Sequence, residues 1–202
     1  MNEKQTGEGQ QLQERGVFKY PKSRLLAVST LFACVLGIAS MISIPIPGPV
    51  PITLQVFVVY LIAMILGPKA GTLSCLVYVL FGVCGLPVFA GLTSGLSVLI
   101  GPTGGYLFGF VAGPSIGGIF CRRRGASKQN DMIRLCLCAV TVLFMIYSIG
   151  VLWLSFYVGG SIRYAFELGA VPFIPLDILK AVIALPIALQ IRWSRLGIPI
   201  AI

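Results

Sequence analysis

The 202-residue chain contains no histidine and only 6 acidic residues. Histidine is the commonest metal ligand and the usual proton carrier near neutral pH, so its absence excludes a Ser-His-Asp triad and a His-Glu-x-x-His zinc motif. A divalent cation needs several carboxylates in one place, which so few acidic residues do not readily supply. The sequence therefore predicts no catalysis, no metal and no other cofactor, and it argues against a membrane enzyme acting on lipid.

Three further features that would assign the chain to another class are missing. No Gly-x-x-x-x-Gly-Lys-[Ser/Thr] loop is present, so we expect no ATP site of that kind. No signal peptide is visible, because residues 1–24 are polar; we expect a cytoplasmic tail there and a membrane domain over residues 25–202. The six cysteines form no Cys-x-x-Cys pair and lie in or beside apolar segments, where we expect them to act as packing residues.

What the chain does contain is apolar sequence: 57% of its residues are hydrophobic, 10% are charged, and the mean hydropathy is +0.96. A soluble domain averages about 25% charged residues, so this composition predicts an all-α integral membrane protein. Six apolar segments approach the length that crosses a bilayer as a helix, and Gly67-Pro68-Lys69 joins the second and third into a tight hairpin. The six segments are 25–43, 52–66, 70–85, 104–121, 132–157 and 172–191.

Lysine and arginine residues indicate the orientation of this predicted six-helix bundle. Of the 15 such residues, all except Arg163 and Lys180 fall in or beside the N-terminal tail, the second and fourth connections and the C-terminus. These regions lie on one side of a six-span protein, and cations mark the cytoplasmic side. We therefore predict a multi-pass protein of the cell membrane with both termini in the cytoplasm. The net charge of +9 then reflects topology and does not indicate nucleic-acid binding.

Two connections on the opposite side are unusually apolar for loops. Residues 44–51, the proline loop, contain four prolines and no charge, and residues 86–103, the glycine loop, are also uncharged. Proline makes the first loop stiff and extended. We interpret both loops as lids folded over the bundle, although misplaced helix ends or loops resting on lipid headgroups would give the same composition. The lid residues singled out are Pro49, Pro51, Gly101, Gly104 and Gly105.

The glycine loop leads into Gly101-Pro-Thr-Gly-Gly-Tyr-Leu-Phe-Gly-Phe110, a glycine-dense turn followed by an apolar helix. Such bare backbone is tolerated at membrane depth only where it lines a cavity or packs inside protein. The segment therefore indicates a site.

Polar side chains inside the predicted spans are rare. Asp177 and Lys180 lie three residues apart, on one face of the sixth helix near its outer end. Charged groups at this depth usually mark a substrate or ion path, although an internal ion pair that fixes helix packing is an alternative. Gln55 and Tyr106 are weak signals alone, and Tyr78 in the third helix has a similar core alternative. Together with the lids, these residues predict a small-molecule pocket with apolar walls.

A stripe of small residues marks the first helix, where Ser29, Ala33 and Gly37 recur every four positions. Such a stripe lets another helix approach closely. Packing within the bundle and contact with a partner subunit are equally consistent with it.

Five motifs follow one another over about residues 25–192: Pro49-Val-Pro-Ile-Thr-Leu-Gln55, Leu66-Gly-Pro-Lys-Ala-Gly-Thr72, Gly85-Leu-Pro-Val-Phe89, the decapeptide from Gly101 to Phe110, and Pro175-Leu-Asp-Ile-Leu-Lys180. Together they resemble the BioY family, the biotin-binding membrane subunit (S component) of energy-coupling factor (ECF) transporters. The resemblance implies a six-helix subunit that holds biotin near the outer surface, beneath the loops. It also implies that the first helix meets a transmembrane coupling protein, which works with ATPase subunits. The residues it places at the ligand are Gln55, Tyr106, Asp177 and Lys180.

The chemistry of biotin agrees with these side chains. Asp177 could accept a hydrogen bond from a ureido N–H, and Lys180 could either donate to the ureido carbonyl or pair with the carboxylate. In the first case the carboxylate needs backbone N–H groups, hydroxyls such as Thr93 or Ser94, or water. Transport would be driven by the separate coupling module or by the chain acting alone. Two rivals stay open, an S component for thiamine or riboflavin and a gradient-driven carrier for an organic anion.

Overall fold

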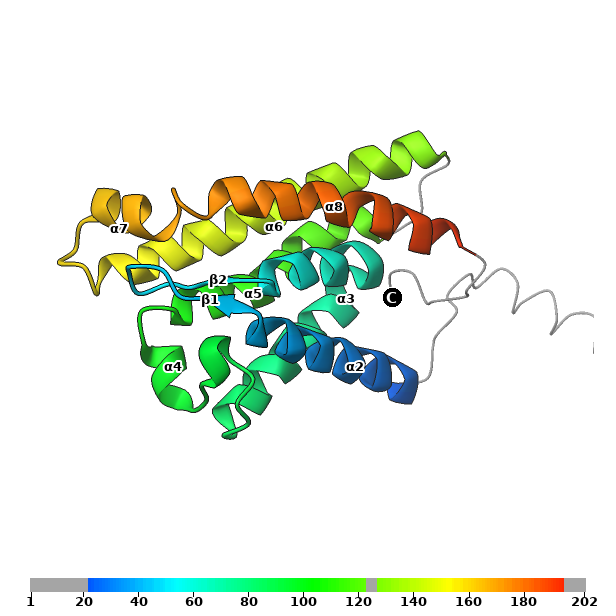
Figure 1. Cartoon of the computed structure of the whole chain (residues 1–202). Helices are drawn as coiled ribbons and strands as arrows, with labels where there is room; N and C mark the ends of the chain where they lie inside the picture. Colours follow the sequence, from blue (N-terminus) through cyan, green and yellow to red (C-terminus); the bar gives the residue numbers. More distant parts are fainter. Residues whose placement is uncertain (1–21, 123–126, 195–202) are drawn as a thin grey trace, which may run out of the picture.

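The computed structural model of the chain describes residues 22–122 and 127–194, which form a bundle of helices (Figure 1). Long helices dominate because each satisfies its own backbone hydrogen bonds, as a bilayer requires. In chain order the elements are α2 (Lys22–Met41), β1 (Ser43–Ile44), β2 (Ile52–Thr53), α3 (Gln55–Val83), the 3-10 helix η1 (Ala90–Leu92), α4 (Leu96–Ile100), α5 (Gly104–Gly117), the 3-10 helix η2 (Gly118–Cys121), α6 (Lys128–Ser155), α7 (Ile162–Gly169) and α8 (Ile174–Trp193).

Five segments of the described chain are long and apolar enough to span a membrane: α2, α3, α5 with η2, α6 and α8. α3 is itself two helical arms, because Gly67 adopts φ 72° and ψ −165° and Pro68 follows it. Only glycine adopts such a φ without strain, and proline lacks the N–H that would continue the helix. The side chains of Gln55 and Tyr78 hydrogen-bond across this break, although a straight helix would hold them about 35 Å apart. The predicted hairpin turn is therefore confirmed.

The ends of the helices lie at two opposite ends of the bundle (Figure 1). α2 begins, η2 ends, α6 begins and α8 ends at one end of the bundle. We call it the basic end, since Arg24, Arg122 and Lys128 belong to it. The β1–β2 hairpin, α4 and α7 lie at the opposite end, which we call the loop end. This arrangement agrees with the predicted sidedness. The predicted tail and C-terminus themselves lie almost wholly outside the described residues.

The proline loop forms a short antiparallel hairpin, in which Ser43 of β1 is paired with Thr53 of β2. Proline cannot donate to a strand ladder, which confines the pairing to two residues on each side. The hairpin tip approaches α7, since a Cβ added at Gly48 would lie 3.4 Å from Leu168. The sequence predicted an extended lid here but not a hairpin.

The glycine loop folds down onto the bundle, as predicted for a lid. The ring of Phe89 lies so close to α3 that a Cβ added at Gly82 would approach the ring to 2.0 Å. The backbone N–H of Gly95 donates to the Gly82 carbonyl at 2.8 Å, and the Ser40 hydroxyl of α2 donates to the Val88 carbonyl at 2.6 Å. The loop is thus attached to two helices by packing and hydrogen bonds.

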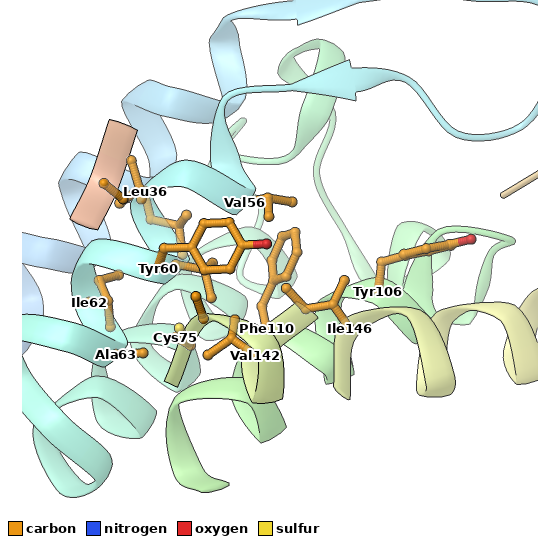
Figure 2. Close-up of a cluster of buried hydrophobic side chains, with 14 of the residues drawn as sticks. Leu36, Val56, Tyr60, Ile62, Ala63, Cys75, Tyr106, Phe110, Val142 and Ile146 are labelled. Atoms are coloured by element: carbon orange, nitrogen blue, oxygen red, sulfur yellow. The ribbon is translucent and has the colours of Figure 1, made fainter. Parts of the chain in front are cut away.

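Glycine residues of α5 allow it to pack closely against α6. A Cβ added at Gly105 would lie 2.2 Å from the Cβ of Trp153, and one added at Gly109 would lie 2.7 Å from the Cα of Ile146. Small residues promote such contacts where water does not drive helices together. Figure 2 shows part of the interior that results, filled by side chains from α2, α3, α5 and α6.

The small-residue stripe of α2 faces the inside of the bundle. Ser29, Ala33 and Gly37 are all buried, and the Ser29 hydroxyl donates to the Ala70 carbonyl of α3 at 3.2 Å. A Cβ added at Gly37 would lie 3.3 Å from Val88 in the glycine loop. The interpretation of these three residues as a partner interface is therefore wrong. Packing within the chain, the alternative reading of the stripe, is the one that the structure supports.

A buried ion pair joins α6 and α8 at the basic end. The Arg192 guanidinium donates through Nε and Nη2 to the two carboxylate oxygens of Asp131, each at 3.0 Å, and both side chains are fully buried. Nη1 also donates to the carbonyls of Met64 and Cys121, again at 3.0 Å. From the sequence, Arg192 is expected only as a cytoplasmic cation beside the last span, and this buried contact is not predicted.

Candidate functional site

A cavity of about 210 Å³ lies at the loop end, between the two loops and the adjoining ends of α3, α5, α6 and α8. Most of its wall is apolar, and a few polar side chains reach it, as is usual for a small-molecule pocket. The polar residues that line it are Thr53, Gln55, Thr93, Thr103, Tyr106, Tyr147, Asp177 and Lys180. The location beneath the lids agrees with the predicted pocket.

Asp177 and Lys180 form an ion pair in the wall of the cavity. Both lie near the start of α8, three residues apart on one face, and Lys180 Nζ is 2.7 Å from Asp177 Oδ1. Asp177 lies in the first helical turn, where the helix dipole favours a negative charge. The side chains are 4% and 15% exposed, respectively. A buried pair alone is weak evidence for a stabilising role, and this one borders a cavity that a ligand can enter.

Two further groups complete this charged cluster. The Tyr147 hydroxyl of α6 donates to Asp177 Oδ2 at 2.7 Å, and Lys180 Nζ donates to the Thr53 carbonyl of β2 at 2.7 Å. These bonds hold the carboxylate and the ammonium in one geometry, and they connect α8 to α6 and to the proline loop. Sequence reasoning missed Tyr147, because a tyrosine in the middle of an apolar helix carries no distinguishing signal.

Gln55, Tyr106 and Tyr78 occupy different positions relative to the cavity. Gln55 and Tyr106 line it, whereas Tyr78 is fully buried behind Gln55 and hydrogen-bonded to the amide nitrogen of that side chain. The Tyr106 hydroxyl donates to the Gly169 carbonyl of α7 at 2.9 Å. Tyr106 therefore offers mainly its ring to the cavity, and Tyr78 supports Gln55 from behind.

The decapeptide that indicated a site contributes side chains to the cavity and glycines to packing. Thr103, Tyr106, Leu107 and Phe110 line the cavity. The predicted lid residues Gly101, Gly104 and Gly105 are not among the lining residues; at Gly104 and Gly105 an added Cβ would collide with a neighbouring segment.

Of the other predicted lid residues, Pro49 and Pro51 both line the cavity, so the proline loop forms part of its wall. Thr93 of the glycine loop also lines it, and Ser94 is not among the lining residues.

The cavity therefore combines an acceptor, a cation and an amide on one wall with apolar surface elsewhere. Among the described lining residues, Asp177 and Lys180 are the only charged ones. Such a site suits a small molecule with a polar, hydrogen-bonding head and an apolar body.

The fold and the cavity define a class, namely multi-pass membrane proteins with a ligand pocket at one end of a helical bundle. A sequence model of the BioY family matches residues 10–196. The chain belongs to the BioY family, as its five motifs indicated.

Relatives of known name are similar over most of the chain. "Biotin transporter BioY" of Thermotoga maritima is 45% identical over 84% of this chain and 96% of that protein. "Probable biotin transporter BioY" of Pyrococcus horikoshii is 40% identical over 86% and 99%, respectively. A crystal structure described as the S-component for biotin from an ECF-type ABC transporter superimposes with a TM-score of 0.77 at 26% identity, over 89% of this chain and 96% of that one.

Proposed function

We propose that the chain is the biotin-binding subunit of a vitamin uptake system and that biotin occupies the cavity beneath the two loops. The observation that carries the proposal is the Asp177–Lys180 pair in the wall of an otherwise apolar cavity. Biotin has the matching two-part character, with a polar ureido group on an apolar thioether ring and an aliphatic chain. The similarity to two named biotin transporters supports the same ligand.

The ureido ring binds at the charged cluster. A carboxylate can accept about four hydrogen bonds, and Asp177 has Lys180 and Tyr147 as its side-chain donors, so it has room for one ureido N–H. The Gln55 amide donates to Tyr78 through its nitrogen, which leaves its oxygen to accept from the second ureido N–H. Lys180 has three N–H donors and gives the third to the ureido carbonyl.

The carboxylate of biotin then lies away from Lys180. Thr93 and Thr103 line the cavity on the side of the glycine loop and α5, and Thr93 is exposed. Hydroxyls and water at this open side can solvate a carboxylate without a buried counterion. In this arrangement Lys180 remains available to donate a hydrogen bond to the ureido carbonyl.

Uptake is energised by a separate ECF coupling protein and ATPase pair, which would complete the transporter in the cell membrane. The chain contains no phosphate loop of its own, and its structural neighbour is described as part of an ECF-type ABC transporter. Measuring biotin uptake in cells that lack the coupling protein distinguishes ECF-driven uptake from transport by the chain alone. ECF-driven uptake should be lost in such cells. Uptake that persists there and follows a proton or sodium gradient would identify a gradient-driven carrier.

The proposed site is tested by two variants, Asp177→Asn and Lys180→Met. Each removes a charged group that hydrogen-bonds the ureido ring in the proposed complex, so we expect biotin affinity to fall on the order of 10- to 100-fold or more. Binding of labelled biotin to the purified variants in detergent measures this. Membrane insertion is checked by recovery of the variants in the membrane fraction.

Glu167→Gln is the matched control, because Glu167 is a half-exposed carboxylate of α7 that pairs with Arg163 and does not line the cavity. This variant should bind biotin as the unmodified chain does. Normal affinity in both Asp177→Asn and Lys180→Met would refute the assigned site.

A further inference from the structure

Tyr60 has a buried hydroxyl without a hydrogen-bond partner. The residue is fully buried in α3, and its oxygen is the single unpartnered buried side-chain N or O atom of the described chain. Buried tyrosine hydroxyls usually find a partner, because an unpaired polar group in the interior is destabilising. This orphaned donor therefore needs an explanation.

The hydroxyl lies behind the cavity wall, since Tyr60 itself is not among the lining residues. Tyr60 follows Val56 by one helical turn on the same face of α3, and Figure 2 shows its oxygen directed toward Val56 and Phe110. Both of those residues line the cavity. The hydroxyl also interacts electrostatically with the Asp177 carboxylate and the Tyr147 hydroxyl. An unpaired donor thus lies behind Val56 and Phe110 of the cavity wall, within electrostatic range of the charged cluster.

The charged cluster does not satisfy this donor. Asp177 receives one hydrogen bond from Lys180 on Oδ1 and one from Tyr147 on Oδ2. Tyr60 forms no hydrogen bond with either residue. The O–H of Tyr60 is therefore free to donate to an acceptor that enters from the cavity.

We infer that Tyr60 is a further ligand-binding residue, whose hydroxyl donates to the ureido carbonyl oxygen of the bound head group. This inference rests on the proposed function. In a cyclic urea each N–H group is directly beside the carbonyl group. A site that recognises the ring therefore needs a hydrogen-bond acceptor beside a donor, and Asp177 and Tyr60 are such a pair. A carbonyl oxygen has two acceptor sites, and Lys180 and Tyr60 fill one each. The head group must displace the side chains of Val56 and Phe110 slightly to reach the hydroxyl.

The test is Tyr60→Phe, which removes the hydroxyl and keeps the ring. We expect biotin binding to weaken about tenfold, the effect of losing one good hydrogen bond. The ligand-free protein should melt at the same temperature or higher, because the variant removes an unpaired buried group. A merely structural tyrosine would not give this combination of weaker binding and unimpaired stability.

Tyr164→Phe is the control, since Tyr164 is exposed on α7 and does not line the cavity; it should leave both binding and melting unchanged. A change in biotin Kd of less than threefold in Tyr60→Phe would overturn the inference. A weaker affinity together with a melting temperature lower by several degrees would also overturn it, because the hydroxyl would then support the fold. Failure of the unmodified chain to bind biotin would instead refute the proposed function.

Discussion

Arg192 illustrates at the residue scale how a full charge is accommodated inside this bundle. Its side chain is 0% exposed, and Asp131, Met64 and Cys121 accept its hydrogen bonds. Two of these acceptors are backbone carbonyls near helix ends, at the break in α3 and at the end of η2, where the helical hydrogen-bond pattern stops. One guanidinium therefore connects α3, η2, α6 and α8 at the basic end.

Removing this guanidinium should be costly. In Arg192→Met, the buried Asp131 keeps Trp193 as a hydrogen-bond donor but loses the two hydrogen bonds from the guanidinium, so we predict a loss of about 3–5 kcal/mol in stability. Thermal unfolding in detergent measures the change. The paired variant Asp131→Leu with Arg192→Met should regain part of it, because the buried carboxylate is then removed together with the guanidinium that bound it. If the single variant unfolds like the unmodified chain, the pair does not stabilise the basic end.

Residues whose chemistry is unusual in lipid could be located from the sequence, whereas several ordinary apolar-helix residues at the cavity could not. Asp177 and Lys180 stood out because charges are expensive at membrane depth, and the structure places both at the cavity. Tyr147 and Tyr60 did not stand out, because an aromatic residue is ordinary in an apolar helix. Arg192 was misinterpreted because a cation just after a predicted span usually lies in the aqueous phase.

At the scale of the elements, the contact between α5 and α6 depends on glycine. Gly109→Ala would place a Cβ 2.7 Å from the backbone of Ile146, which forces the helices apart, and we predict a loss of about 1–3 kcal/mol. Gly113→Ala is the milder control on the same helix. The Cβ added there would be closest to a Val142 methyl group, at 3.2 Å, and that side chain can move. Melting temperatures should fall more in the first variant. Equal melting in both would contradict the close packing of the two backbones.

The long elements were predictable and the short ones were not. Each predicted span lies within a few residues of a helix or helical arm, because a bilayer imposes both a length and an apolar composition. The β1–β2 hairpin, α4 and α7 carry no such signal. The sequence predicts only a connection where α7 lies. The ends of α7 are nevertheless marked by Ser161, whose hydroxyl accepts from the Tyr164 N–H, and by Gly169.

For the whole molecule, the sidedness predicts which end is accessible from outside the cell. Arg163 on α7 has a side chain that is 91% exposed, and Lys128 is exposed at the start of α6. In a variant without its native cysteines, Arg163→Cys should react with a membrane-impermeant maleimide in intact cells. Lys128→Cys should react only after the cells are lysed. The reverse labelling pattern would contradict a cytoplasmic basic end.

The central claim is that the cavity binds biotin, and equilibrium binding of labelled biotin to the purified chain tests it most directly. Unlabelled biotin should displace the label, whereas thiamine and riboflavin should not, because neither presents to Asp177 and Lys180 a cyclic urea with an N–H group on each side of its carbonyl. A well-folded chain that binds no biotin, or whose bound label is displaced by thiamine or riboflavin, would contradict the account.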